Sequence, residues 1–218
     1  MGIDMSKMSI AHQSVEQWRK LHDHSYFDRH PRYQGLPANS GMGDLLREYV
    51  GLHESESVLE IGCGYGGLMQ DIADDVRTIH GVDVHEAPIA QARTFLAEKA
   101  NAHVAVYDGV TLPFEAGAFT VVYCFLVLQH LPRAFVPLII AEAYRVLADG
   151  GRMCMQTYGG DPNRPTNNQH RGDIDLTIST EQSLSWTPDA FAAAADGLPL
   201  RGLIVRKYGL SLILTGTR

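Results

Sequence analysis

The sequence predicts an α/β fold, a doubly wound sheet of seven strands that is mostly parallel and ends in an antiparallel hairpin. Strand-like and helical patterns alternate between residues 57 and 157, which is typical of strand–helix–strand units. The first apolar stretch runs into four glycines within six residues and then into a helical pattern, as at a nucleotide-binding turn. Near the C-terminus only two residues separate the strand-like stretches 203–207 and 210–215, too few for a parallel crossover.

The seven predicted strands are short stretches of apolar, β-prone residues bounded by turn residues. In chain order they are residues 57–61, 76–82, 102–106, 120–127, 152–157, 203–207 and 210–215. The stretch 120–127 is apolar on both faces, which indicates a central strand of the sheet.

The predicted helices carry apolar side chains at helical spacing, and several have terminal signals. Ser40 is the expected N-cap of the second helix, which Gly51 ends. Thr187 and Pro188 begin the last helix as its cap and first residue, and Gly197 follows its end. The predicted ranges are residues 9–23, 41–50, 67–75, 86–100, 132–147 and 188–196.

The length of 218 residues suits one domain with a full core and a small appendage. Residues 1–40 are expected to form an N-terminal helical extension, which either closes over the site as a lid or docks as a polar loop. Residues 41–218 are expected to form the α/β domain. Within it, the long polar connection 158–185 is expected to be an insertion on the substrate side, because connections of this length tend to be functional or disordered.

Composition excludes several classes of partner. The net charge is -7 and no Lys/Arg run occurs, which disfavours nucleic acid as a partner. No apolar stretch reaches the ~20 residues of a membrane span, and the N-terminus lacks a signal-peptide pattern. The three cysteines, Cys63, Cys124 and Cys154, are far apart and are expected to be buried small hydrophobes in a reducing cytoplasm. No metal site is expected.

The glycine-rich turn fits two kinds of adenosine cofactor. Gly62, Gly64 and Gly67 satisfy the dinucleotide pattern G-x-G-x-x-G, which is weak when it occurs alone. Asp83, 21 residues after Gly62, would end the second strand and bind ribose hydroxyls in either case. The turn therefore predicts an adenosine-type cofactor and leaves its identity open.

Glu60 separates the two possibilities. A carboxylate two residues before the first glycine repels a pyrophosphate and suits a cofactor with a cationic amino-acid end. Residues 60–66, E-I-G-C-G-Y-G, resemble the first motif, E/D-x-G-x-G-x-G, of the class I (Rossmann-like) S-adenosylmethionine (SAM)-dependent methyltransferases of the small-molecule type. The resemblance extends from about Val50 to the C-terminus, and the closing hairpin also resembles these enzymes rather than the dehydrogenases.

The resemblance implies SAM as the cofactor, S-adenosylhomocysteine as its product, and a site at the carboxyl ends of the strands. It implies that Gly62, Gly64 and Gly66 pass under the cofactor and that Glu60 orients this loop and senses the methionine ammonium. It also implies that the carbonyl of Phe125 accepts from this ammonium.

The ends of the second and third strands supply the remaining cofactor-binding candidates. Asp83 can accept from both ribose hydroxyls, and Val84 follows it at the strand end. Asp108 can accept from the adenine amino group, and the backbone N–H of Gly109 or Val110 can donate to the ring.

The expected reaction is methyl transfer to a small polar molecule, with oxygen favoured over nitrogen as the acceptor. His130 follows the fourth strand and acts either as a general base or as a residue that lines the site. The substrate-binding candidates come from the extension and the insertion: Trp18, Tyr26, Tyr33, Tyr158, His170 and Arg171. The alternatives are a SAM-binding protein without turnover and, less favoured, an NAD-dependent oxidoreductase.

Overall fold

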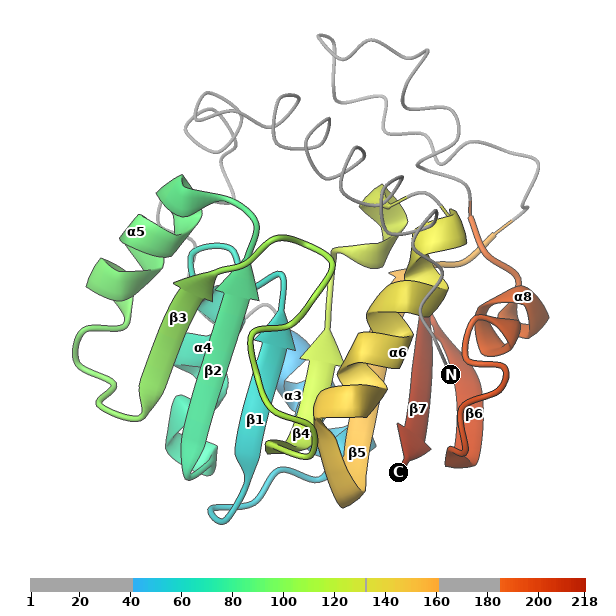
Figure 1. The fold of residues 1–218 in the computed structure, drawn as a ribbon, viewed down its shortest axis with the longest axis horizontal. Coiled ribbons are helices and arrows are strands. Elements are labelled where there is room, and N and C mark those ends of the chain that lie inside the picture. Colours follow the sequence, from blue (N-terminus) through green and yellow to red (C-terminus); the bar gives the residue numbers. More distant parts are fainter. Residues whose placement is uncertain (1–40, 132, 161–184) are drawn as a thin grey trace, which may run out of the picture.

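The computed structural model describes residues 41–131, 133–160 and 185–218, which build a seven-stranded sheet in the order β3-β2-β1-β4-β5-β7-β6 (Figure 1). The predictions for the N-terminal extension and for most of the substrate-side insertion lie outside the described residues. The strands are β1 Ser57–Ile61, β2 Thr78–Asp83, β3 Ala102–Val106, β4 Phe119–Cys124, β5 Leu147–Tyr158, β6 Arg201–Tyr208 and β7 Ser211–Thr217.

Strand pairing confirms the mostly parallel sheet. β1 pairs in parallel with both β2 and β4, and the parallel part continues to β3 on one side and β5 on the other. β7 is antiparallel to both of its neighbours, β5 and β6. The carboxyl ends of the parallel strands therefore share one edge of the sheet, with β1 and β4 adjacent at its centre.

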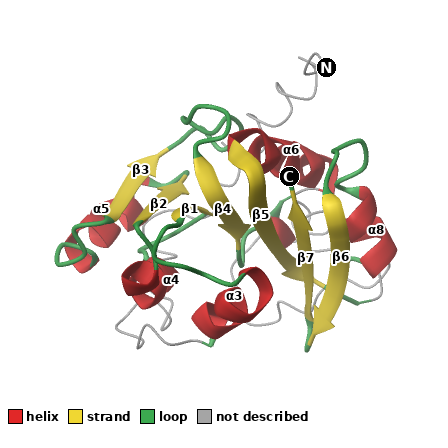
Figure 2. Cartoon of the chain, turned by 90° about the horizontal axis from the view of Figure 1, so that it is seen from below, coloured by secondary structure: helices red, strands yellow, loops and turns green. Residues whose placement is uncertain are grey.

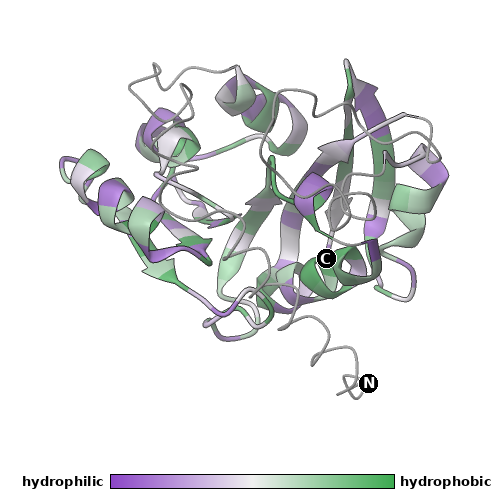
Figure 3. Ribbon diagram, turned by 90° about the horizontal axis from the view of Figure 1, so that it is seen from above, coloured by the Kyte–Doolittle hydropathy of each residue, from purple (hydrophilic) through white to green (hydrophobic). Residues whose placement is uncertain are grey.

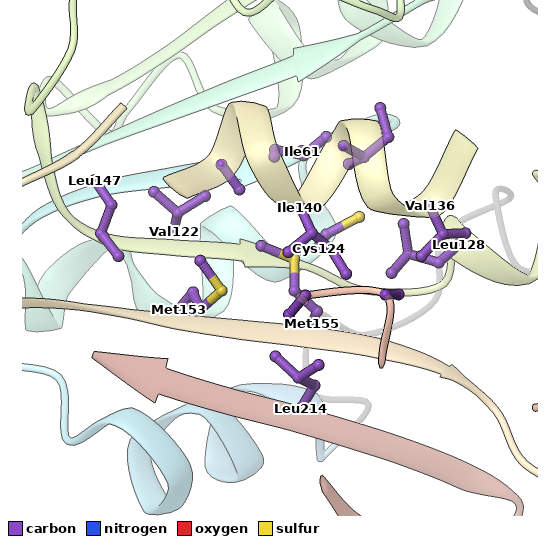
Figure 4. Packing of buried hydrophobic residues seen from close by; sticks show 14 of the residues in the cluster. Ile61, Val122, Cys124, Leu128, Val136, Ile140, Leu147, Met153, Met155 and Leu214 are labelled. Atoms are coloured by element: carbon purple, nitrogen blue, oxygen red, sulfur yellow. The ribbon is translucent and has the colours of Figure 1, made fainter. Parts of the chain in front are cut away.

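Helices cover both faces of the sheet, as the doubly wound fold requires (Figure 2). One core joins α3, α4 and α5 to the sheet, and another joins α6 and α8 to its opposite face. Figure 4 shows the second core, where Ile140 of α6 lies over Cys124 of β4. The bounds are α3 Met42–Val50, α4 Gly67–Ile72, α5 Glu86–Phe95, α6 Val136–Val146 and α8 Pro188–Ala193, with short 3₁₀ helices η2 Ala73–Asp75, η3 Leu128–His130 and η4 Arg133–Phe135.

The terminal signals were partly correct. Thr187 caps α8 by accepting from the N–H of Ala190 at 3.2 Å, and Gly51 ends α3 in the left-handed region with φ 63°. The prediction of Ser40 as an N-cap was wrong, because Gly41 occupies that position without a side-chain cap.

Three elements near the carboxyl edge of the sheet are shorter than predicted. The helix over 86–100 ends at Phe95, with the buried Leu96 as its C-cap. The strand over 120–127 ends at Cys124, and Leu126 takes a positive φ of 60°. The helix over 132–147 begins only at Val136, after two 3₁₀ turns, and β5 begins at Leu147.

Candidate active site

The glycine loop, residues 62–66, joins β1 to α4 at the carboxyl edge of the sheet. Gly62, Gly64 and Gly66 all have positive φ, at 80°, 53° and 83°. The N–H groups of Gly62 and Cys63 donate to the carbonyl of Val82 at 2.7 and 3.0 Å, which ties the loop to the end of β2. The loop is thus held by backbone hydrogen bonds in a conformation that suits glycine.

The loop glycines should differ in their tolerance of alanine. A Cβ at Gly62 would lie 2.1 Å from Cγ2 of Val127, whereas a Cβ at Gly64 meets nothing within 4 Å. Both substitutions strain a positive φ, by about 1–2 kcal/mol. Because Gly62→Ala adds a steric clash, we expect its melting temperature to fall clearly further than that of Gly64→Ala, measured by thermal unfolding. Equal decreases in melting temperature would mean that the side chain of Val127 can move away from the new Cβ without loss of stability.

Glu60 lies in β1 with its side chain buried beneath the loop. Its Oε2 accepts from the hydroxyl of Tyr123 at 2.8 Å, and the two residues are partners in the β1–β4 register. Burial raises the pKa of Glu60 to about 8; the Tyr123 hydrogen bond opposes this rise and the Asp83 charge adds to it. The carboxyl group is therefore mostly protonated at neutral pH until a cation approaches.

Asp83 ends β2 beside the loop. Its Oδ2 accepts from the N–H of Gly64 and its Oδ1 from the N–H of His85, both at 3.0 Å. Burial raises the pKa of Asp83, while hydrogen bonds from the backbone of His85 and Gly64 lower it. A carboxylate has about four acceptor positions. Each oxygen can therefore also accept from a ribose hydroxyl while Asp83 holds the loop.

Asp108 follows β3 and is exposed. Its Oδ1 accepts from the N–H groups of Val110 and Thr111 at 2.8 and 2.7 Å. Of the two backbone donors predicted for the adenine ring, that of Val110 is thus already engaged, which leaves Gly109 as the candidate.

An apolar cluster includes residues that follow these two acidic residues in the chain. Val110 and Phe135 are buried together, and Val84 packs against them while remaining partly exposed. The predicted site residue Val84 therefore joins Val110, which was predicted only as a backbone donor, and Phe135, which the sequence patterns did not single out. Such an apolar cluster, with Val84 next to Asp83 in the chain and Val110 two residues after Asp108, suits the face of an adenine ring.

The segment after β4 lies next to the glycine loop, as the contact of Gly62 with Val127 shows. Phe125 is buried at its start, and His130 lies partly exposed in η3. The amide nitrogen of Gln129 lies 3.3 Å from Nε2 of His130.

Of the predicted substrate-binding residues, the structure describes Tyr158. It lies partly exposed at the carboxyl end of β5, opposite Ser211 of β7. The other candidates lie outside the described residues: Trp18, Tyr26, Tyr33, His170 and Arg171.

Two further expectations can be compared with the described part of the chain. Cys63, Cys124 and Cys154 are all buried and free of disulfides, as predicted. None of the helices in residues 41–131, 133–160 and 185–218 has the length and apolar character needed to cross a membrane.

The arrangement fits SAM at three points. The backbone of the loop has open space beside it at Gly64. Asp83 offers acceptors for the ribose hydroxyls, and the buried carboxyl group of Glu60 can pair with the ammonium group of the ligand. All three lie at the carboxyl ends of the neighbouring strands β1 and β2, at the edge of the sheet viewed from above in Figure 3, which is where α/β sheets bind ligands.

Comparison with known sequences gives a consistent result. The family profile described as "Methyltransferase domain" matches residues 58–151. The ubiquinone biosynthesis O-methyltransferase of Pseudomonas aeruginosa is 30% identical over 160 residues, which cover 71% of this chain and 66% of that protein. The sterol 4-C-methyltransferase strm-1 of Caenorhabditis elegans is 30% identical over 128 residues, 56% of this chain and 38% of that protein.

Solved structures share the fold. The PH0226 protein of Pyrococcus horikoshii superposes with a TM-score of 0.68 at 21% identity, covering 89% of this chain and 99% of that one. The geranyl diphosphate C-methyltransferase of Streptomyces coelicolor, solved with Mg²⁺, geranyl diphosphate and S-adenosylhomocysteine, gives a TM-score of 0.65 at 15% identity, covering 82% and 79%.

The matched region spans 66% of the Pseudomonas relative, just under two thirds of its length. The matched residues 58–151 include the loop motif at 60–66, so the comparison agrees with the methyltransferase domain that this motif predicts. Residues 58–151 of this chain are thus similar to a methyltransferase domain, and the described sheet shares its fold with the solved structures above.

Proposed function

We propose that this protein transfers a methyl group from SAM to an oxygen atom of a small polar molecule. The observation that carries the proposal is the row formed by Glu60 with its glycine loop, Asp83 and Asp108 on the adjacent strands β1, β2 and β3. The preference for oxygen is supported by the relative from Pseudomonas aeruginosa that is named an O-methyltransferase. The net charge of -7 argues against nucleic acid as the acceptor.

When bound, SAM supplies a methyl group on a cationic sulfur. The contribution of the chain is then to align the acceptor and to exclude water. Asp83 holds the ribose, Val84 and Asp108 hold the adenine, and Glu60 supplies negative charge near the amino-acid end.

An oxygen acceptor also benefits from losing its proton. We assign this task to His130, whose Nε2 lies 3.3 Å from the amide nitrogen of Gln129 and would accept the proton of the acceptor hydroxyl. The substrate side is assigned to Tyr158, and the candidates outside the described residues remain part of the proposal: Trp18, Tyr26, Tyr33, His170 and Arg171.

Calorimetric titration with S-adenosylhomocysteine, with NAD in parallel, tests the cofactor. Micromolar binding of S-adenosylhomocysteine alone supports the proposal, and binding of NAD alone contradicts it. Labelled SAM is then offered with phenols, alcohols, carboxylic acids, amines and carbon acceptors in separate pools. Label transfer to an oxygen compound is the expected result. Transfer only to amines or carbon acceptors would keep the methyltransferase and reject oxygen, and cofactor binding without transfer to any pool would favour a binding protein.

Replacing Asp83 by alanine should weaken S-adenosylhomocysteine by about tenfold to a hundredfold, because hydrogen bonds to a charged group contribute about 1.5–3 kcal/mol. Asp83→Asn is the matched control, since it keeps one carbonyl acceptor and should lose less. Calorimetric dissociation constants measure both effects. Unchanged affinity in Asp83→Ala would remove this residue from the site.

A further inference from the structure

Leu126 stands out in the backbone at the end of β4. Among the described residues it is the non-glycine residue with a positive φ, at 60°. A leucine in this left-handed region costs about 1–2 kcal/mol and persists only where its surroundings hold it. Leu126 is also 36% exposed, so its side chain does not explain the conformation by packing in the core.

The residue that holds this turn is Gln156, which is buried in β5. Its Oε1 accepts from the N–H of Leu126 at 2.7 Å. Its Nε2 donates to Oγ of Ser211 in β7 at 2.9 Å and to the carbonyl of Thr157 at 3.2 Å. A buried amide anchored by two strands thus fixes the peptide group between Phe125 and Leu126.

The planarity of that peptide has a direct consequence for the Phe125 carbonyl. In a trans peptide the C=O and the following N–H point in opposite directions, and the described residues contain no cis peptide. Because the N–H of Leu126 points to the side-chain oxygen of Gln156, the carbonyl of Phe125 points away from that oxygen. β4 lies between β5 and β1, so this is the side on which the glycine loop lies.

A second contact places the loop at that position. A Cβ on Gly62 would lie 2.1 Å from the side chain of Val127, two residues after Phe125. The turn after β4 and the start of the glycine loop are therefore in direct contact. A carbonyl facing this side is presented to the amino-acid end of a ligand that lies on the loop.

We propose that Gln156 is a positioning residue, which aims the Phe125 carbonyl at the ammonium group of the cofactor. The inference rests on the proposed function, since it requires a ligand with an amino-acid end. Gln156 does not touch this ligand. It acts through the Leu126 N–H, and its contribution is to keep one acceptor in place before the ligand arrives.

The test compares two ligands that differ in the ammonium group. S-adenosylhomocysteine carries the amino-acid end, whereas 5′-methylthioadenosine has the same nucleoside and thioether without it. In Gln156→Met, which keeps the length of the side chain but loses the amide, S-adenosylhomocysteine should bind about tenfold more weakly. Binding of methylthioadenosine should be unchanged, because adenine and ribose contacts lie at β2 and β3. Calorimetry on the full chain measures both ligands.

Gln156→Glu is the conservative control. It retains a carbonyl oxygen for the Leu126 N–H and should restore most of the affinity for S-adenosylhomocysteine. Equal weakening of both ligands in Gln156→Met, or unchanged affinity for S-adenosylhomocysteine, would overturn the inference. If the wild-type protein binds methylthioadenosine but not S-adenosylhomocysteine, the assigned ammonium site is wrong. If it binds neither, the proposed function fails.

A second variant covers the case in which Gln156→Met does not fold. Ser211→Ala removes one of the two groups that hold the Gln156 amide and leaves the bond to Leu126 in place. We expect a smaller loss of affinity, again confined to S-adenosylhomocysteine. Weakening of methylthioadenosine to the same extent would show that Gln156 supports the fold only.

Discussion

His130→Ala is expected to lower turnover by about a hundredfold or more while leaving the affinity for S-adenosylhomocysteine nearly unchanged, because general bases contribute about 10²–10⁴ in rate. The expectation follows from the position of His130 in η3, directly after the central strand β4. Initial rates with labelled SAM and the best acceptor measure turnover, and calorimetry measures affinity.

Two results would change this assignment. A loss of S-adenosylhomocysteine affinity that matches the loss of turnover would make His130 a cofactor contact. An unchanged rate would leave it as a residue that lines the site. His53→Ala is the matched control, because His53 is an exposed histidine in the turn before β1, at the opposite edge of the sheet. We expect this variant to retain wild-type rates.

Glu60→Gln is expected to stabilise the folded protein, by an amount that increases as the pH rises from about 4.5 to 8. Burial raises the pKa of Glu60 in the folded chain to about 8, from 4.5 as the ordinary value. Between these values the folded state holds the proton and the unfolded state has lost it, so stability falls as the pH rises. Glutamine keeps an acceptor for Tyr123 and never ionises. The difference at pH 8 should be roughly 3–5 kcal/mol.

Urea unfolding of both proteins at several pH values measures this difference. Glu56→Gln is the control of opposite sign: burial opposes ionisation there, but the hydrogen bonds with Thr120 and Arg152 prevail and hold the pKa of Glu56 below its usual value. Glu56 therefore adds stability above its unfolded pKa and loses it as the pH falls, so Glu56→Gln should destabilise the protein at neutral pH. A pH-independent effect of Glu60→Gln would show that its carboxyl group ionises normally.

Glu60→Gln should also weaken the binding of the cofactor. An ammonium group near Glu60 favours ionisation of the carboxyl group, so S-adenosylhomocysteine affinity should rise with pH in the wild-type protein and less in Glu60→Gln. The buried carboxyl group of Glu60 thus lowers the stability of the free protein, and the positive charge of the bound ligand offsets this cost. We expect the site to contain a group whose replacement raises stability and lowers affinity, which is common where function requires strain.

The strand ends could be predicted from the sequence because they depend on local signals. Glu60 and Asp83 lie where an apolar strand meets turn residues, and parallel strands bring such ends to one edge. Local signals also explain why the prediction that the fourth strand extends to residue 127 was wrong. Residues 125–127 remain apolar, so nothing in their pattern shows that the chain turns at Leu126.

The sequence by itself determined the fold class, the order of the elements, the cofactor family and the acidic positions at the ends of β1, β2 and β3. Only the tertiary structure decided which groups meet across the sheet. Tyr123 reaches Glu60 from 63 residues away, and Gln156 reaches Leu126 from 30 residues away. Both contacts depend on β4 lying between β1 and β5, a spatial order that results from packing the whole sheet and has no local pattern in the chain.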